Sequence, residues 1–379
     1  MLLVGVVLGP YALDYLDPDL LSIGADLRLI ALLVILLRAG FALQRRTLHE
    51  VGRRVLLLAF IPAICEGAVI TLAAYRILDF TWLEAALLGS VIAAVSPAVI
   101  VPSMLHYNKV RKGTEKAIPT MVMAASSVDD VFVIVVYTGL LGLYTGHTTA
   151  MVWQVVSVPV SLVLGIAAGL GIGWLLCHHF DRFNPRATKR VLLIIAIAIM
   201  LVRVEHLLQG WIPFAGLVSA MAIGFVILEK REHAAHEISA KLAKIWVFAE
   251  IILFALVGAQ VSLAVMWQSG LAGLVIILFG LSARALGAAA CLAASNLNAS
   301  ERVFVIVSFM PKATVQAAIG AGPLLAMQVA GQPTAAGEII LAIAVLSIVL
   351  TAPLGAWAIS FLGERVLKQE DPYPQPAQS

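Results

Sequence analysis

The chain has 379 residues, of which 61% are hydrophobic and only 12% are charged, and its formal net charge is +3. An ordinary soluble domain is about 45–50% apolar and about 25% charged, so a soluble globule of this size could not hide so much apolar surface from water. The same composition excludes a disordered chain, and the small, dispersed positive charge gives no indication of nucleic-acid binding. The bulk of the polypeptide is therefore predicted to lie in a lipid bilayer.

Long apolar segments follow one another along the chain. A bilayer core needs about 20 apolar residues in helical form, and continuous runs rich in Leu, Ala, Ile and Gly favour helices over the alternating strands of a barrel. We predict an all-α multi-pass membrane protein with about twelve transmembrane segments. Their ranges are about 1–13, 20–43, 53–78, 82–106, 116–144, 151–177, 188–207, 211–229, 243–265, 270–294, 303–327 and 337–362.

The loops between these segments predict the orientation. Lys and Arg gather in loops 44–54, 106–116, 177–190 and 229–244, whereas loops 14–19, 145–150 and 328–336 carry none. Because positive residues favour the cytoplasmic side, both termini are predicted to be cytoplasmic, in a cell (inner or plasma) membrane. We predict one transmembrane domain over 1–365 and a disordered cytoplasmic tail over 366–379, which is rich in proline.

Two segments contain proline near their middles. The fourth has Ser96 followed by Pro97 and later Pro102, and the eleventh has Pro311. Proline removes a backbone donor and clashes with the preceding turn, and the groups that it frees at bilayer depth must find partners inside the protein or at a water-lined cavity. Ordinary kinks are the alternative. We predict two discontinuous helices with breaks at these residues.

The positions of the two broken segments predict an internal repeat. They are seven segments apart, so they run through the membrane in opposite directions, and each is the middle of a triplet. Two triplets of opposite orientation with interrupted central helices are the layout of an inverted-repeat secondary transporter. In such proteins the substrate binds near the bilayer midplane, where the interrupted helices cross.

Five ionisable residues lie near mid-depth in the predicted segments, where charge is costly and marks function by default. All of them belong to the two triplets, and they are Glu66, Asp129, Asp130, Arg284 and Lys312. The adjacent aspartates point about 100° apart on a helix, so one can face a cavity while the other meets a neighbouring helix. A carboxylate in such a cavity can hold either a proton or a small hard cation, and this exclusion couples the two.

Nearby oxygen atoms complete the predicted cation site. The closest hydroxyl groups, in the same helix or in the second broken segment, are those of Ser126, Ser127 and Thr314. Together with carbonyls freed at the first break, they could complete the shell of a transported monovalent cation held by Asp129 and Asp130.

The other three charges have a structural or modulating role in this interpretation. Glu66 and Arg284 lie at corresponding depths of the two triplets, so we predict that they pair. Lys312 follows the second break, where its ammonium offsets the negative end of a helix dipole and could also pair with Asp129. The alternative is that the aspartates are simply neutralised by the two basic residues as a buried structural cluster.

Three long stretches resemble the cation:proton antiporter superfamily, and most closely its NHA-type Na+/H+ exchanger branch with the NhaA-like fold. They are AAVSPAVIVPSM at 93–104, PTMVMAASSVDDV at 119–131 and MPKATVQAAIGAGPL at 310–324. The resemblance implies that the paired acidic residues bind the ion and the proton, with Asp130 as the principal ion carboxylate. It also implies a homodimer without a cofactor, in which a core of about 53–144 and 270–362 moves against a dimerisation part of about 1–43 and 151–265.

We therefore predict a secondary active antiporter, and not an enzyme, that exchanges Na+ or Li+ for protons by alternating access. Electrogenic relatives have a lysine where this chain has Arg284, and because arginine keeps its proton in proteins, one-for-one exchange is favoured. K+/H+ exchange by the same fold is the alternative, since ion choice depends on cavity size and oxygen geometry.

Three other classes of membrane protein agree less well with the sequence. An organic-anion transporter conflicts with the net negative charge of the five residues. An intramembrane aspartyl protease needs two aspartates that face each other and share a proton, whereas Asp129 and Asp130 are adjacent in one helix. A channel would show a repeated filter sequence or rings of charge.

Overall fold

The computed structural model describes residues 1–17, 19–20, 23–42, 45–144, 151–208 and 211–369. Within these ranges the secondary structure is helical and strands are absent, apart from one isolated bridge between Lys112 and Gln369. Seven spans in the same ranges are long and apolar enough to cross a membrane. The prediction of an all-α multi-pass membrane protein is confirmed. Loop 145–150 and the tail from residue 370 lie outside the described residues.

The described helices follow in chain order. The first group comprises α1 (Leu2–Leu8), α3 (Gly24–Ala42), α4 (Arg45–Ile77), α5 (Trp82–Ala93), α6 (Pro97–Lys109), α7 (Ile118–Tyr144), α8 (Met151–Phe183) and α9 (Ala187–Leu208). The second comprises α10 (Gly216–Lys230), α11 (Glu232–Ala259), α12 (Leu263–Leu292), α13 (Ala299–Ser308), α14 (Thr314–Ile319), α15 (Gly322–Val329) and α16 (Ala335–Val366).

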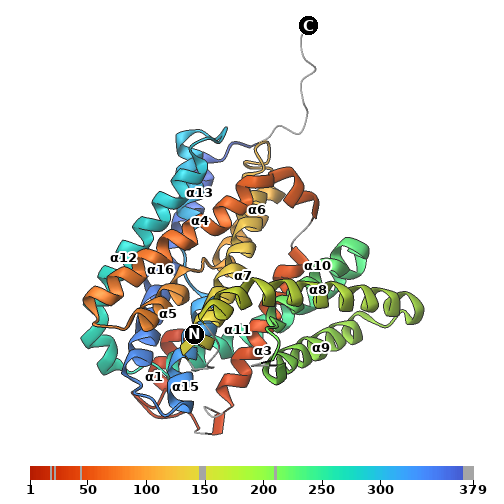
Figure 1. Ribbon diagram of the computed structural model, residues 1–379. Helices are drawn as coiled ribbons and strands as arrows, with labels where there is room; N and C mark the ends of the chain where they lie inside the picture. Colours follow the sequence, from red (N-terminus) through yellow and green to blue (C-terminus); the bar gives the residue numbers. More distant parts are fainter. Residues whose placement is uncertain (18, 21–22, 43–44, 145–150, 209–210, 370–379) are drawn as a thin grey trace.

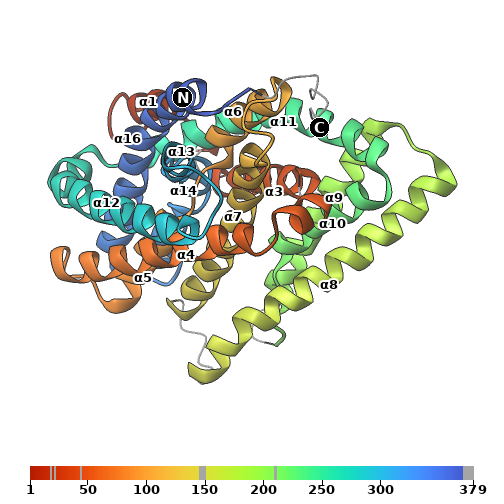
Figure 2. The same ribbon diagram turned by 90° about the horizontal axis from the view of Figure 1, so that it is seen from above.

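The helices pack as two bundles. In one, α4 lies against α5, α7 and α12, and α12 also contacts α16. In the other, α10 packs against α3, α8 and α9, and α11 packs against α1 and α3. Figure 1 shows α8, α9 and α10 projecting away from the bundle that contains α4, α5 and α12, and Figure 2 shows α8 along one edge of the molecule. Short α14 contacts α3 and α11 and so joins the two bundles.

The first broken segment has its interruption where the sequence predicts it. α5 ends at Ala93 and α6 begins at Pro97, and between them Ala94 and Ser96 have extended backbone. Pro97 occupies the first turn of α6, where the missing N–H has no helical partner to lose. The predicted break at Pro102 is wrong, because Pro102 lies inside α6. A single lost helical bond there produces no interruption, as is common in membrane helices.

The second broken segment is interrupted twice. α13 ends at Ser308 and α14 begins at Thr314, so that Pro311 lies in the non-helical stretch between them. A second interruption separates α14 from α15, which has Pro323 in its first turn. The single segment expected at 303–327 is therefore three short helices, because Pro311 cannot continue α13 and Pro323 favours the first turn of α15.

Two charged loops expected from the sequence are largely helical. α4 begins at Arg45, inside the predicted loop 44–54, and α11 begins at Glu232, inside the predicted loop 229–244. Arg, Lys, Glu and Leu are good helix formers, so these helices continue beyond their apolar parts. Hydropathy marks the part of a helix that is suited to lipid, and it does not mark where the helix begins.

Candidate functional site

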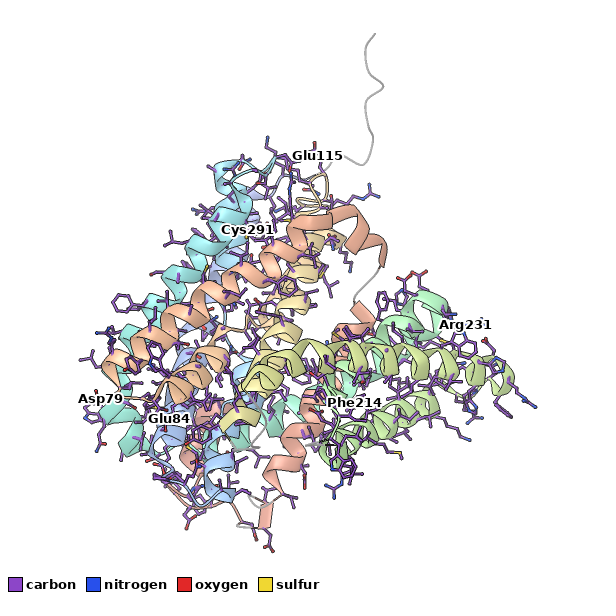
Figure 3. The ribbon with its side chains drawn as sticks, in the orientation of Figure 1. Asp79, Glu84, Glu115, Phe214, Arg231 and Cys291 are labelled. Carbon is purple, nitrogen blue, oxygen red and sulfur yellow. The ribbon has the colours of Figure 1, made fainter. Side chains whose placement is uncertain are left out.

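Five charged side chains are buried together where the two broken segments meet, whereas Asp79, Glu115 and Arg231 illustrate exposed charges on the outside (Figure 3). The five buried charges come from four different places in the chain: Glu66 on α4, Asp129 and Asp130 on α7, Arg284 on α12, and Lys312 between α13 and α14. Four of them have no exposed surface, and Asp130 is 4% exposed. The residues that sequence reasoning singled out for their charge therefore lie in one buried cluster.

Glu66 is the common partner of both basic residues. Its Oε2 accepts hydrogen bonds from Nε of Arg284 and, at 2.6 Å, from Nζ of Lys312. The expected pairing of Glu66 with Arg284 is present. The suggested pairing of Lys312 with Asp129 is absent, because Nζ of Lys312 is directed to Glu66 and the oxygens of Asp129 accept from Val95 and Arg284. The backbone N–H of Lys312 donates to Oγ1 of Thr351 at 2.8 Å, which fixes the base of its side chain against α16.

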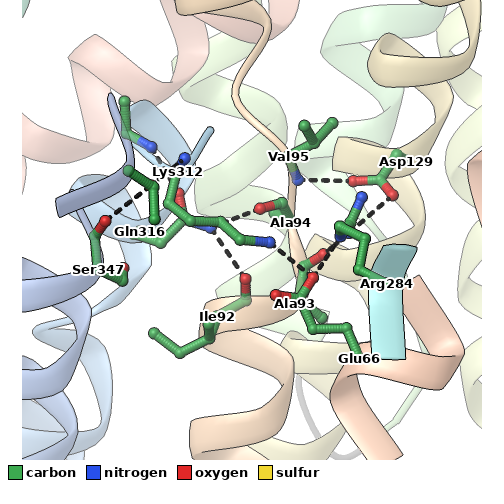
Figure 4. A network of polar contacts seen from close by, with 12 residues as sticks. Glu66, Ile92, Ala93, Ala94, Val95, Asp129, Arg284, Lys312, Gln316 and Ser347 are labelled. Atoms are coloured by element: carbon green, nitrogen blue, oxygen red, sulfur yellow. Dashed lines mark hydrogen bonds and ion pairs between the residues drawn. The ribbon is translucent and has the colours of Figure 1, made fainter. Parts of the chain in front are cut away.

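Asp129 is tied to the first helix break (Figure 4). Its Oδ2 accepts from the backbone N–H of Val95 at 2.8 Å, and its Oδ1 accepts from Nη2 of Arg284 at 3.2 Å. The same Nη2 also donates to the carbonyl of Ala93. Because hydrogen bonds to charged groups are stronger than neutral ones, Asp129 and Arg284 hold the non-helical backbone of this break in place.

Asp130 differs from its neighbour. It makes no hydrogen bond or ion pair with any described residue, and its Oδ1 is a buried atom without a partner. Glu66 also has an unpartnered oxygen, Oε1, but its other oxygen contacts two cations. Glu66, Asp129, Arg284 and Lys312 balance one another in charge, so the remaining negative charge of the cluster belongs to Asp130.

The predicted hydroxyl ligands have other partners. Ser126 and Ser127 each donate to the carbonyl of Met123 at 3.0 Å, one turn back on α7. Oγ1 of Thr314 lies 3.3 Å from Oγ of Ser96, and the Thr314 backbone N–H donates to that same Ser96 oxygen at 3.3 Å. Serine and threonine hydroxyls retain free lone pairs in such contacts, so their role toward a cation stays a prediction.

The two breaks also touch through their backbones. The N–H of Ser96 donates to the carbonyl of Pro311 at 2.9 Å, which joins the first break to the second directly. Groups freed from helical hydrogen bonding at one break thus find partners at the other. This contact brings segments that are more than 200 residues apart in the sequence to the same point.

Sequence reasoning missed Gln316. This fully buried residue on α14 donates from Nε2 to the carbonyls of Ile92 and Ala94, at 3.3 and 2.7 Å, and its Oε1 accepts from the N–H of Ala313 at 2.9 Å. The signal was a polar amide one helical turn after Lys312 in an otherwise apolar stretch. The sequence reasoning used ionisable side chains and neighbouring hydroxyl groups, and a neutral amide belongs to neither class.

The chemistry that the cluster can perform follows from these ion pairs and hydrogen bonds. Four charges are joined by ion pairs into one network, in which Oε1 of Glu66 and Nη1 of Arg284 have no hydrogen-bond partner among the described residues. Asp130 is the one charged residue of the five that makes no ion pair with a described residue, and its carboxyl group can be neutralised by one proton or by one monovalent cation. Among the described residues, no group of three or more His, Cys, Asp or Glu side chains is placed to hold a metal ion. Other ligands for a cation at Asp130 would come from neutral oxygens, which suit hard cations.

Comparison with known proteins agrees with this description. The sequence model of the family described as "Sodium/hydrogen exchanger, transmembrane" matches residues 1–364. The chain is 31% identical to the human protein "Sodium/hydrogen exchanger 9B2" over 350 residues, which are 91% of this chain and 64% of the relative. It is 34% identical to the protein of that name from Xenopus tropicalis over 354 residues, 92% of this chain and 65% of the relative.

The chain thus spans slightly under two thirds of the length of these curated relatives. Among solved structures, it is similar to the sodium proton antiporter MjNhaP1 from Methanocaldococcus jannaschii at pH 8, with a TM-score of 0.84 and 20% sequence identity. That match covers 96% of this chain and 91% of the solved one, and it establishes the fold. On the family match and the identity to these relatives, the chain belongs to the transmembrane sodium/hydrogen exchanger family.

Proposed function

We propose that this chain is a secondary active antiporter that exchanges Na+ for H+ across a membrane, with Asp130 as the carboxyl group that carries each ion in turn. The observation that carries the proposal is the contrast within the acidic pair. Asp129 has both oxygens occupied by Val95 and Arg284, whereas Asp130 is buried beside it without a partner. The names of its relatives, sodium/hydrogen exchangers, support the choice of ions.

Exchange follows from competition at Asp130. An isolated buried carboxylate is strongly disfavoured, so Asp130 is expected to hold either a proton or a cation in every stable state of the protein. Binding of Na+ then requires release of the proton, and binding of the proton requires release of Na+. Because Asp129 is neutralised by Arg284, which keeps its proton, one Na+ exchanges for one H+. Competition at both aspartates is the broader form of this proposal.

Alternating access completes the mechanism. We take the bundle of α4–α7 and α12–α16 as the core that carries the site, and α1, α3 and α8–α11 as the scaffold against which it moves. The broken segments are proposed to cross at the site within two inverted repeats of an arrangement of about twelve membrane segments. The packing of helices into two bundles, joined in part through short α14, supports this division.

The remaining assignments concern assembly and context. We propose a homodimer in a cell (inner or plasma) membrane with both termini in the cytoplasm, as the distribution of Lys and Arg between loops favours. Li+ is proposed as a second substrate and K+ as the alternative. Their relative rates depend on how closely neutral oxygens approach Asp130.

The test is ion-driven proton movement in proteoliposomes. Purified wild-type protein is reconstituted with a pH-sensitive dye inside, and Na+, Li+ or K+ is added in turn at a fixed pH gradient. Asp130→Asn removes the exchangeable charge and is expected to abolish cation-evoked proton movement. Asp79→Asn is the matched control, because Asp79 is exposed and its φ of +52° is a conformation that Asn adopts readily. Undiminished exchange by Asp130→Asn would remove Asp130 from the mechanism.

A further inference from the structure

The carbonyls at the end of α5 have partners outside their own helix. A helix that stops leaves its last four carbonyls without intrahelical donors, and in a membrane each of them needs a partner. At this break the carbonyls of Ile92 and Ala94 accept from Gln316, and that of Ala93 accepts from Arg284. Donors from α12 and α14 therefore bind three successive carbonyls at the break between α5 and α6.

Gln316 uses both its amide nitrogen and its amide oxygen to bind the backbone of the breaks (Figure 4). An amide has two N–H donors and one carbonyl oxygen. Both bonds of Nε2 go to the first break, and Oε1 caps the N–H of Ala313 at the second break. One neutral side chain thus bonds to the backbone of both interruptions, at 2.7–3.3 Å.

These bonds lie next to the acidic pair. Ala94 precedes Val95, whose N–H binds Asp129, and Asp129 precedes Asp130. On the other side, Ala313 precedes Thr314, whose hydroxyl lies beside that of Ser96. The amide of Gln316 therefore binds both backbone stretches, the one that holds Asp129 through Val95 and the one that leads into Thr314.

We propose that Gln316 is a positioning residue for cation exchange: it holds the two helix breaks at the separation that the cation site at Asp130 requires. This inference rests on the proposed function, since it assigns Gln316 a part in that same site. It differs from a general stabilising role because it predicts a specific effect on cation affinity. Partners of metal-binding residues contribute about ten- to hundredfold in affinity without touching the ion.

The isosteric variant Gln316→Glu distinguishes a positioning role of Gln316 in cation binding from a general stabilising role. A protonated glutamate can still accept from Ala313 and donate one hydrogen bond to Ala94, whereas an ionised glutamate has no donor and places a negative charge against two carbonyls. The activity of Gln316→Glu relative to wild type is therefore expected to fall as pH rises. Gln316→Ala has no titratable group, so its relative activity is expected to change little over the same range.

The comparison of Gln316→Glu with wild type and with Gln316→Ala also involves the other titratable groups near α14. The charged groups around the breaks are those of Glu66, Asp129, Asp130, Arg284 and Lys312, and α3 and α11, which contact α14, carry Arg38 and Glu250. The charged residues of α5 and α16 lie in their terminal turns. All of these groups are common to wild type and both variants, so a pH dependence that arises in Gln316→Glu and is absent from Gln316→Ala is assigned to the new carboxyl group.

The experiment measures initial exchange rates in proteoliposomes at several Na+ concentrations between pH 6.5 and 8.5, with both variants and the controls Gln328→Glu and Gln328→Ala. Gln328 is an exposed residue of α15. For Gln316→Ala we expect the KM for Na+ to rise roughly tenfold, with a smaller loss of maximal rate. Should that variant not be recovered as a monodisperse protein, the pH series of Gln316→Glu decides alone.

Hydrogen–deuterium exchange gives a readout that does not depend on transport. Loss of the amide is expected to accelerate exchange in peptides that cover residues 92–97 and 311–317, and not elsewhere. Unchanged KM, pH profile and amide exchange in Gln316→Glu would overturn the role of Gln316 and leave the proposed function standing. A wild type without exchange, or an active Asp130→Asn, would instead overturn the proposed function, whatever the amide exchange shows.

Discussion

The N–H of Val95 and the carboxylate of Asp129 are joined by a hydrogen bond of 2.8 Å that links a helix break to the acidic pair on α7. The bond gives Asp129 a structural task that Asp130 lacks. Since Arg284 occupies the second oxygen of Asp129, the two neighbouring aspartates are expected to respond in opposite ways to the same substitution.

Asp129→Asn is expected to lower stability, and Asp130→Asn to leave it unchanged or to raise it. The first variant loses a charged partner of Arg284, at a cost of about 1.5–3 kcal/mol. The second removes a buried carboxyl that has no partner among the described residues. Apparent melting temperatures in detergent, measured without Na+ at pH 8, give the order. A lower melting temperature for Asp130→Asn than for Asp129→Asn would contradict this assignment of partners.

Glu66→Ala is expected to be strongly destabilising. Glu66 is the shared anion of Arg284 and Lys312, and its removal leaves two buried positive charges with one remaining carboxylate partner. Breaking a buried ion pair from one side costs about 3–5 kcal/mol, so little folded protein should be recovered. The yield in gel filtration and the melting temperature measure this, with Glu115→Ala on the exposed surface as control. Normal recovery of Glu66→Ala would show that the network is dispensable.

Gly322→Ala is expected to destabilise the contact between α15 and α7. A Cβ at Gly322 would lie 1.9 Å from the hydroxyl of Tyr137, which cannot be accommodated without a shift. Overpacking of this kind costs about 1–3 kcal/mol. The double variant Gly322→Ala/Tyr137→Phe should recover part of the loss, because the next ring atom is 3.1 Å away.

Melting temperatures of the two single variants and the double variant form a cycle that isolates this contact. Gly171→Ala serves as control, because a Cβ there meets nothing within 4 Å and alanine favours the helix by up to about 1 kcal/mol. Additive effects of the changes at Gly322 and Tyr137 would show that the hydroxyl is not what excludes a side chain.

Glu301→Gln is expected to cost less stability than Glu301→Ala. Glu301 binds Nζ of Lys116 at 2.8 and 3.0 Å and also caps α13 together with Asn298. Glutamine can keep the capping box, so the variant removes the ion pair alone. Glu301→Ala loses both and should cost about 1 kcal/mol more. Equal melting temperatures of the two variants would show that the cap contributes nothing.

The sequence predicted those features for which the membrane imposes a cost. Charge at bilayer depth is expensive, so the five charged residues were visible without a structure, and the structure places them in one buried cluster. Pro97 and Pro311 marked backbone that cannot continue a helix, and both lie at observed breaks. The resemblance to the exchanger family, read from three motifs, is confirmed by the family match over residues 1–364.

Features that depend on three-dimensional partners were not predictable in this way. Lys312 binds Glu66, whereas the oxygens of Asp129 bind the backbone of the first break and Arg284 on α12, and this choice of partners depends on the packing of segments far apart in the sequence. Pro102 reads like Pro97 in the sequence, yet α6 continues through it. Gln316 carries no charge, so its cost in lipid is lower and its role is visible only once the carbonyls that it satisfies are known.

The bonds between the two breaks bear on how the chain inserts into the membrane. The carbonyls of Ile92 and Ala94 in the first half of the chain depend on Gln316 in the second, and the N–H of Ser96 depends on the carbonyl of Pro311. A fragment that lacks either half would leave these groups without partners inside the membrane. Each half of the chain therefore depends on the other for its backbone hydrogen bonds, so neither half is expected to insert stably when expressed alone.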